Sequence, residues 1–154
     1  MLRGLILTCL LFSGIDKNFA QPKSKKDSVV DFAGTLLGTK YTFGMQDPVN
    51  GFDCSGFVHY VFNRFRVPLP RASMDYERIG HKIMIDSVQP GDILVFTGTN
   101  AAIRHPGHVG IVNKIENKEI TLFIPHPAAT TKEWSLPTFL RWLAIRNDTF
   151  GLYG

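Results

Sequence analysis

Three residues of the chain have side chains that could act together in one reaction: a cysteine at position 54 and histidines at positions 108 and 126. A deprotonated thiol attacks carbonyl carbon, and an imidazole can take its proton near neutral pH and later return it. A second imidazole can hold the first one in the required tautomer. Cys54, His108 and His126 are therefore candidates for the nucleophile, the general base and the orienting group of an acyl transfer reaction.

The residues around Cys54 predict that its sulfur lies at the beginning of a helix. A loop with glycine, proline and asparagine leads to Asp53, and apolar residues with helical spacing follow as far as residue 65. Asp53 is a typical N-cap, so Cys54 falls in the first turn, where free N–H groups and the helix dipole lower the pKa of a thiol. We expect Gly56 to leave space above the sulfur for a substrate. The alternative is that Cys54 is a small buried apolar residue.

The two histidines belong to two predicted strands, residues 108–115 and 119–126, connected by a turn. A three-residue turn at residues 116–118 would place residue 115 opposite residue 119. Counted outward from there, His108 lies directly opposite His126 on one face, with Cβ atoms about 5 Å apart. A turn that is longer or shorter by one residue would put the two imidazoles on opposite faces of the sheet.

The N-terminal residues predict a secretory signal peptide. Arg3 precedes a short apolar run, residues 5–15, and Ala20 is a small residue directly before a polar segment. We expect cleavage after Ala20, so that residues 1–20 are removed. A buried N-terminal helix is the alternative, and the residues before Cys9 disfavour a lipid anchor there.

Cleavage would leave Cys54 as the only cysteine of an exported protein. An unpaired thiol in an oxidising compartment risks oxidation, so its presence needs a chemical reason. We expect residues 21–27 to form a linker and residues 28–154 to form one catalytic domain.

The composition fits one globular domain. The chain has 154 residues, of which 44% are hydrophobic and 19% are charged, with two cysteines. This size can bury a core without cross-links, and two cysteines exclude a disulfide framework. The formal charge of +4 fits an anionic partner only weakly. The sequence does not interleave basic and aromatic residues, which argues against nucleic-acid binding.

Hydrophobic patterning predicts helices first and strands afterwards. Helical spacing covers residues 28–37 and 53–65. The predicted strands are residues 93–96, 108–115, 119–126 and 142–146, with a short helix or turn at residues 136–141. Helices followed by antiparallel strands predict an α+β domain.

Four segments of the sequence resemble the NlpC/P60 cysteine peptidases, which are papain-like peptidoglycan hydrolases. The segments are Asp53-Cys54-Ser55-Gly56-Phe57-Val58, Leu69-Pro70-Arg71-Ala72-Ser73, Gln89-Pro90-Gly91-Asp92-Ile93 and Gly107-His108-Val109-Gly110-Ile111. The resemblance runs from about residue 29 to residue 146. It implies a papain-like α+β domain in which N-terminal helices pack on an antiparallel sheet.

The resemblance also implies roles for individual residues. Cys54 resembles the family's nucleophile, His108 its general base and His126 its third polar residue. Tyr41 resembles the family tyrosine near the thiol, and further residues line the substrate groove. These predicted substrate-binding residues are Tyr41, Asp53, Ser55 and Ser73. For Asp53 a purely structural role as helix cap is the alternative.

Three features depart from the family pattern. Met45 stands where the family usually has a second glycine after Tyr-x-x-Gly, which would narrow the groove. Pro125 and Pro127 flank His126, so the strand can end or kink there. The long loop at residues 97–107 can cover part of the cleft.

The expected function is that of an exported endopeptidase that cleaves the peptide stems of bacterial peptidoglycan. The resemblance favours the bond between the γ-carboxyl of D-glutamate and a diamino acid. An amidase that cleaves between the lactyl group of the glycan and L-alanine would use the same thiol chemistry. A module that binds the cell wall without turnover is the non-enzymatic alternative.

The expected partner is peptidoglycan or a muropeptide, and no cofactor is implied. We expect a monomer, periplasmic or secreted, that neither binds nucleic acid nor inserts stably into a membrane. A zinc site formed by Cys54, His108 and His126 is an alternative reading of the same residues. The other histidines are expected to be structural: His59, His81 and His105.

Overall fold

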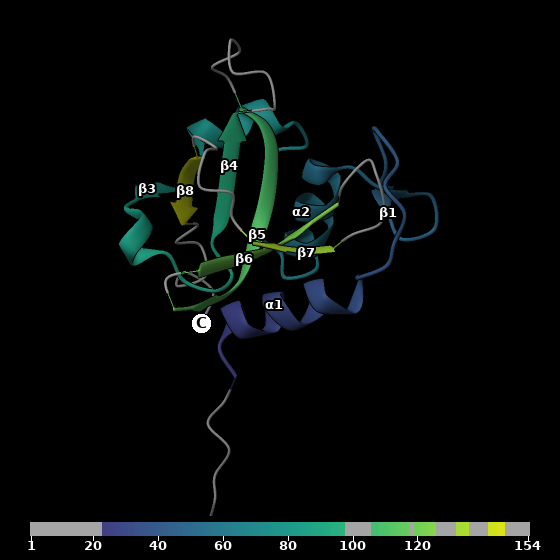
Figure 1. The fold of residues 1–154 in the computed structure, drawn as a ribbon. Coiled ribbons are helices and arrows are strands. Elements are labelled where there is room, and N and C mark those ends of the chain that lie inside the picture. Colours follow the sequence, from purple (N-terminus) through teal and green to yellow (C-terminus); the bar gives the residue numbers. More distant parts are fainter. Residues whose placement is uncertain (1–22, 98–105, 118, 126–131, 136–141, 147–154) are drawn as a thin grey trace, which may run out of the picture.

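A computed structural model describes residues 23–97, 106–117, 119–125, 132–135 and 142–146. Figure 1 shows the α-helices α1 and α2 and a strongly curved antiparallel sheet. None of the helices in the described ranges is both long and apolar enough to cross a membrane. The predicted signal peptide, residues 1–20, lies outside the described residues.

The first helix, α1 (Lys25–Thr35), begins at a capping box. The hydroxyl of Ser24 accepts the N–H of Asp27 at 3.1 Å, and the carboxylate of Asp27 accepts the N–H of Ser24 at 3.2 Å. The helix therefore begins inside the segment that the sequence predicted to be a linker. The apolar stripe located this helix, but its start depends on polar residues that the stripe does not include.

The second helix, α2 (Cys54–Asn63), begins where the sequence predicted, with Asp53 as its N-cap. Its apolar residues Phe57, Val58, Val61 and Phe62 are fully buried. A small hairpin precedes it, formed by β1 (Gln46–Asp47) and β2 (Gly51–Phe52). This hairpin carries the chain from the Tyr41 segment to the helix N-terminus.

Within the described residues the main sheet has six strands, all antiparallel, in the order β3-β8-β4-β5-β6-β7. The strands are β3 (His81–Ile83), β4 (Ile93–Thr97), β5 (Pro106–Glu116), β6 (Glu119–Ile124), β7 (Lys132–Ser135) and β8 (Trp142–Arg146). The predicted strands at 93–96, 108–115, 119–126 and 142–146 correspond to β4, β5, β6 and β8. In Figure 1 the long strand β5 curves past α2, with β3 and β8 at the opposite edge.

A short 3-10 helix, η1 (Ser73–Arg78), lies between α2 and β3, and a second one, η2 (Ile85–Ser87), lies between β3 and β4. Neither of these 3-10 helices was predicted from the sequence, nor were β3 and β7. The predicted helix or turn at residues 136–141 lies outside the described residues. The observed arrangement of helices and antiparallel strands confirms the predicted α+β class.

Apolar side chains gather on both faces of the sheet. The larger cluster joins α1, α2 and η1 to the strands, and it includes Cys54, Tyr76, Val109 and Ile111. The smaller cluster lies around Leu94, Val112 and Leu122. Because Ile111 and Val112 are neighbours in β5 and belong to different clusters, this strand is covered on both faces. The helix that carries the thiol is therefore fixed against β5.

Candidate active site

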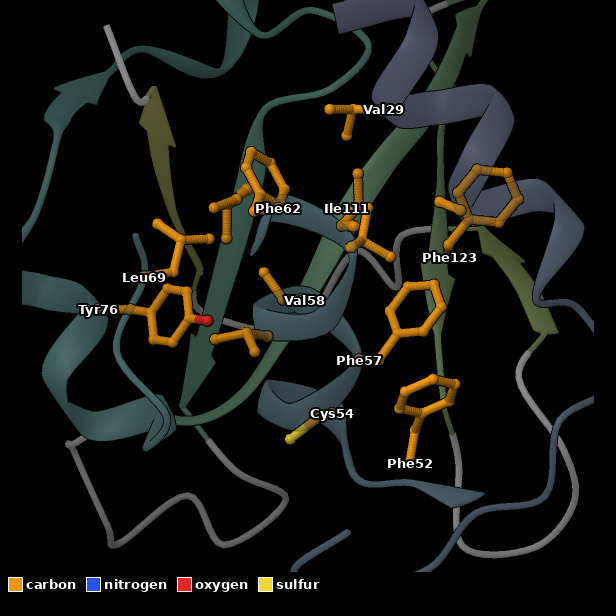
Figure 2. Packing of buried hydrophobic residues seen from close by; sticks show 14 of the residues in the cluster. Val29, Phe52, Cys54, Phe57, Val58, Phe62, Leu69, Tyr76, Ile111 and Phe123 are labelled. Atoms are coloured by element: carbon orange, nitrogen blue, oxygen red, sulfur yellow. The ribbon is translucent and has the colours of Figure 1, made fainter. Parts of the chain in front are cut away.

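Cys54 is the first residue of α2, and its side chain lies at the edge of the core. The carboxylate of Asp53 accepts the N–H of Gly56 at 2.6 Å, which satisfies one of the free donors of the first turn. Only 8% of Cys54 is exposed. The predicted helix start and the predicted cap are both confirmed, and the sulfur lies beside the free N–H groups of the helix end. Figure 2 shows this sulfur at the N-terminal end of α2.

Burial raises the pKa of the Cys54 thiol, and this is the largest influence on it. Hydrogen bonds from the N–H groups of Val109, Ser55 and Cys54 itself lower the pKa, whereas the negative charge of Asp53 raises it. The net direction is upward. The N–H groups of the helix start do lower the pKa, as predicted, but desolvation of the nearly buried sulfur outweighs them, so the predicted net lowering of the pKa is not found.

The hydrogen bond from Val109 brings the beginning of β5 to the sulfur. His108 is the preceding residue of this strand and is half-buried. Its ring lies against Phe96 of β4, with the ring centroids 6.4 Å apart. The chain thus carries the predicted base on the strand that contacts the nucleophile. Proton transfer between the two side chains stays a prediction.

The pairing of β5 with β6 bears on the third candidate, His126. Glu116 pairs with Glu119, so the turn is one residue shorter than predicted, and the register there is shifted. A bulge between Val112 and Lys114 restores the predicted register, in which Val112 pairs with Leu122 and Ile111 with Phe123. The described pairs in this register end at Ile111 and Phe123. His126 lies outside the described residues, so its role stays a prediction.

Arg71 binds the two polar residues on either side of Cys54. Its Nη1 donates to Oδ1 of Asp53 at 2.9 Å and to Oγ of Ser55 at 3.0 Å, and its Nη2 donates to Oδ2 of Asp53 at 2.8 Å. Asp53 and Ser55 are 7% and 6% exposed. The alternative role of Asp53 as a helix cap is confirmed, and the predicted substrate contacts of both residues stay predictions.

Sequence reasoning assigned no role to Arg71. A usable signal was present, because a carboxylate next to a buried nucleophile needs a counter-charge, and Arg71 belongs to one of the four motif segments. The same guanidinium donates to the carbonyl of Met45 at 3.3 Å. Arg71 therefore joins the β1 segment to the helix start.

Tyr41 lies close to the thiol, as the resemblance implied. It forms an isolated parallel bridge with Phe52, and the N–H groups of Thr42 and Phe52 bond to the carbonyls of Phe52 and Lys40 at 3.0 and 3.1 Å. Burial raises the pKa of Tyr41, and the nearby negative charges of Cys54 and Asp53 raise it further. Contact of Tyr41 with substrate stays a prediction.

Ser73 is the first residue of η1 and is half-buried. It follows Arg71 closely, so the segment that supplies the counter-charge of Asp53 also fixes the position of Ser73. Its predicted contact with substrate stays a prediction.

The space next to Gly56 is filled by the protein itself. A Cβ atom at this position would lie 2.2 Å from the carbonyl oxygen of Met45 and 2.9 Å from Oδ1 of Asp53. The expectation that Gly56 leaves room for a substrate was wrong. The glycine is needed because the backbone at Met45 crosses the first turn of α2, where that carbonyl also accepts the N–H of Asp53 at 3.0 Å.

The histidines outside the predicted catalytic set include one with a clear structural contact. Nδ1 of His59 lies 2.9 Å from the carbonyl oxygen of Leu69. His81 is exposed on β3, and His105 lies outside the described residues. Within the described part of the chain, no three histidine, cysteine or acidic residues are grouped closely enough to bind a metal ion. The alternative zinc site includes His126 and so is not tested by this observation.

Known proteins resemble this chain in sequence and in fold. The profile of the NlpC/P60 family matches residues 38–122, which include Cys54, Arg71 and His108. The crystal structure of the NlpC/p60 domain of the peptidoglycan hydrolase SagA superposes with a TM-score of 0.62 and 28% sequence identity, over 79% of this chain and 97% of that domain.

Curated relatives carry the names of hydrolases and endopeptidases. A gamma-DL-glutamyl hydrolase of Bacillus subtilis (strain 168) is 33% identical over 104 residues, which are 67% of this chain and 25% of that protein. The probable endopeptidase NlpC of Escherichia coli (strain K12) is 34% identical over 117 residues, which are 70% of this chain and 73% of that protein. Several other matches span between 21% and 30% of the relative's length. The profile match, these identities and the shared fold show that the chain belongs to the NlpC/P60 family.

Proposed function

We propose that the chain is an exported cysteine endopeptidase that hydrolyses the peptide stems of bacterial peptidoglycan. The observation that carries the proposal is the position of Cys54, which starts α2 and accepts a hydrogen bond from Val109 at the beginning of β5. Membership of the NlpC/P60 family supports this reading, as do the names of the relatives. The proposal that the protein is exported depends on the predicted signal peptide at residues 1–20.

The reaction is an acyl transfer from a peptide to the sulfur and then to water. Because burial raises the pKa of the Cys54 thiol, the resting sulfur carries its proton near neutral pH. His108 takes this proton as the sulfur attacks the carbonyl carbon, and His126 holds the imidazole in the required tautomer. A carbon–sulfur bond forms, and the carbonyl oxygen becomes an oxyanion.

We expect the free N–H groups at the start of α2 to stabilise that oxyanion. When the intermediate collapses, the carbon–nitrogen bond breaks and His108 gives its proton to the leaving amine. Water then attacks the thioester, with His108 as base, and releases the new carboxylate and the thiol. No metal or cofactor enters these steps.

The favoured bond lies between the γ-carboxyl of D-glutamate and a diamino acid. The relative named gamma-DL-glutamyl hydrolase supports a γ-glutamyl linkage. Tyr41, Ser55, Ser73 and Asp53 are the residues proposed to line the groove around it. Among them Tyr41 and Ser73 are half-buried, so they are the two more open to a substrate.

Digestion of purified peptidoglycan followed by mass analysis tests the proposal. We expect stems clipped after γ-D-glutamate, with a new amine on the diamino acid. Release of whole stem peptides from the glycan would instead identify an amidase. Binding to the wall without any product, by wild-type protein shown to be folded, would identify a non-catalytic module.

A further inference from the structure

Tyr76 is a fully buried tyrosine whose hydroxyl the reaction described above does not use. It belongs to η1, which packs on β5 and β4, and it shares the larger core cluster with Cys54, Val95 and Val109. The residue is 0% exposed. A substrate in the groove therefore cannot touch it without displacing the core.

The hydroxyl of Tyr76 has no hydrogen-bond partner among the residues that the structure describes. Leaving a buried hydroxyl unpaired is unfavourable, and a phenylalanine would fill the same volume without that cost. A tyrosine at such a position needs an explanation beyond packing.

Three groups act electrostatically on this hydroxyl: Cys54, Arg71 and Asp53. The carboxylate of Asp53 is already occupied, because it accepts the N–H groups of Gly44 and Gly56 and two bonds from Arg71. The guanidinium of Arg71 is engaged with Asp53, Ser55 and the carbonyl of Met45. The sulfur of Cys54 accepts the N–H groups of Val109, Ser55 and Cys54 itself, and a thiolate there is the acceptor that we consider for the Tyr76 hydroxyl.

The geometry agrees with this choice. In Figure 2 the Cys54 sulfur points away from Phe52, toward the side of α2 on which Tyr76 lies, and the Tyr76 hydroxyl points inward toward that helix. Both side chains belong to one cluster, and Val109, which donates its N–H to the sulfur, belongs to it too.

We propose that Tyr76 is a positioning residue: its hydroxyl donates a hydrogen bond to the Cys54 sulfur when the thiol gives up its proton. This inference rests on the proposed role of Cys54 as nucleophile. The structure leaves the hydroxyl without a partner among the described residues. A neutral thiol is a weak acceptor, whereas a thiolate is a strong one. The hydroxyl then stabilises the charged form of the thiol.

The phenol keeps its proton throughout this step. Burial raises the pKa of Tyr76, and a negative charge on Cys54 raises it further. The hydroxyl therefore stays protonated and able to donate near neutral pH. The other titratable or charged groups around the thiol are Asp53, Tyr41, Arg71 and His108, so the experiment must change Tyr76 alone.

Tyr76→Phe tests the inference, with Tyr60→Phe as the matched control. Tyr60 is a second aromatic residue of the same cluster, but it packs on Phe32 and Phe52, with ring centroids 6.1 and 5.3 Å away. The rate of alkylation of Cys54 by iodoacetamide is measured against pH on the whole folded chain. This readout requires no substrate.

We expect Tyr76→Phe to raise the pKa of the thiol, so that alkylation at neutral pH slows by about tenfold, since a lost hydrogen bond to a charged group has roughly that effect. The kcat for stem-peptide hydrolysis should fall similarly with KM unchanged, and stability should be equal or higher. Tyr60→Phe should leave the alkylation profile at the wild-type position.

An alkylation profile of Tyr76→Phe that coincides with wild type overturns the inference. So does a marked loss of stability, because it would show that the hydroxyl is already paired in the resting protein. If instead the profile shifts while wild type hydrolyses no peptidoglycan, the role of Tyr76 stands and the proposed function is wrong.

Discussion

Arg71 and Asp53 form a two-point ion pair directly beside Cys54, with Nη1–Oδ1 and Nη2–Oδ2 distances of 2.9 and 2.8 Å. The carboxylate is almost completely buried and caps the helix that the thiol begins. Without a counter-charge it would be costly to bury and would oppose ionisation of the thiol. The pair therefore lets a helix cap and a nucleophile occupy neighbouring positions.

Arg71→Ala should lower the free energy of unfolding by about 2 kcal/mol, because it leaves the buried carboxylate with only backbone and hydroxyl donors. Urea unfolding measures this. Arg78→Ala is the matched control: its guanidinium lies 3.7 Å from Asp75, and its side chain is 83% exposed. The control should change stability by less than about 0.5 kcal/mol. Equal effects of the two substitutions would contradict the structural role of the Arg71 pair.

The fold class, the helix that carries Cys54 and four of the six main strands follow from hydrophobic periodicity, because these elements bury apolar residues at regular spacing. The start of α1 does not, since it depends on the Ser24–Asp27 capping box. Strands β3 and β7 are short and pair at or near the sheet edges, so their stability comes from neighbours distant in sequence.

In the candidate site, too, some features could be predicted from local sequence and others could not. Cys54 and its cap could be predicted from local residues. The pKa of the thiol could not, because burial by β5 and η1 outweighs the local helix end. The register between β5 and β6 was predicted from a turn one residue too long, and the bulge at residue 113 compensated for that error. Both the pKa of the thiol and the register of the two strands therefore depend on contacts between residues distant in sequence.

Gly56→Ala should destabilise the protein and reduce activity together. Its Cβ would lie 2.2 Å from the Met45 carbonyl, so the β1 segment must move away from the helix N-terminus. Gly34→Ala in α1 is the control, since its Cβ would meet the Phe123 ring at an ordinary 3.7 Å. We expect the control to be neutral or to stabilise by up to about 1 kcal/mol through helix propensity. Thermal unfolding and hydrolysis rates of the two variants check this, and a Gly56→Ala protein that matches wild type in both would contradict it.

The pH dependence of thiol alkylation should show a raised pKa. Half-maximal reactivity of Cys54 with iodoacetamide in the free protein is expected above pH 9.0, the ordinary value for this group. A raised pKa means that folding favours the neutral form of the Cys54 thiol. This preference stabilises the folded protein fully below the pKa of the thiol in the unfolded chain, and the stabilisation is lost as the pH rises through the pKa of the thiol in the folded protein. Reactivity that is already maximal at neutral pH would contradict this and indicate a preformed thiolate.

The two predicted catalytic histidines should be separable by their kinetics. His108→Ala should lower kcat by about a thousandfold, as expected for removal of a general base. His126→Ala should have a smaller effect on kcat, and His126→Asn should recover part of the loss because an amide can still orient the imidazole. His81→Ala, on the exposed strand β3, is the control and should be unchanged. Hydrolysis rates on a soluble stem peptide decide this, and wild-type activity of His126→Ala would remove it from the site.

The hydrolysis rate of Cys54→Ala on purified stem peptide tests the central claim most directly. The chain carries its proposed nucleophile at the start of α2, so removal of this sulfur should reduce the rate by several orders of magnitude. Circular dichroism and unfolding would show that the variant keeps its fold. A folded Cys54→Ala protein that hydrolyses the peptide within about twofold of the wild-type rate would contradict nucleophilic catalysis by this cysteine.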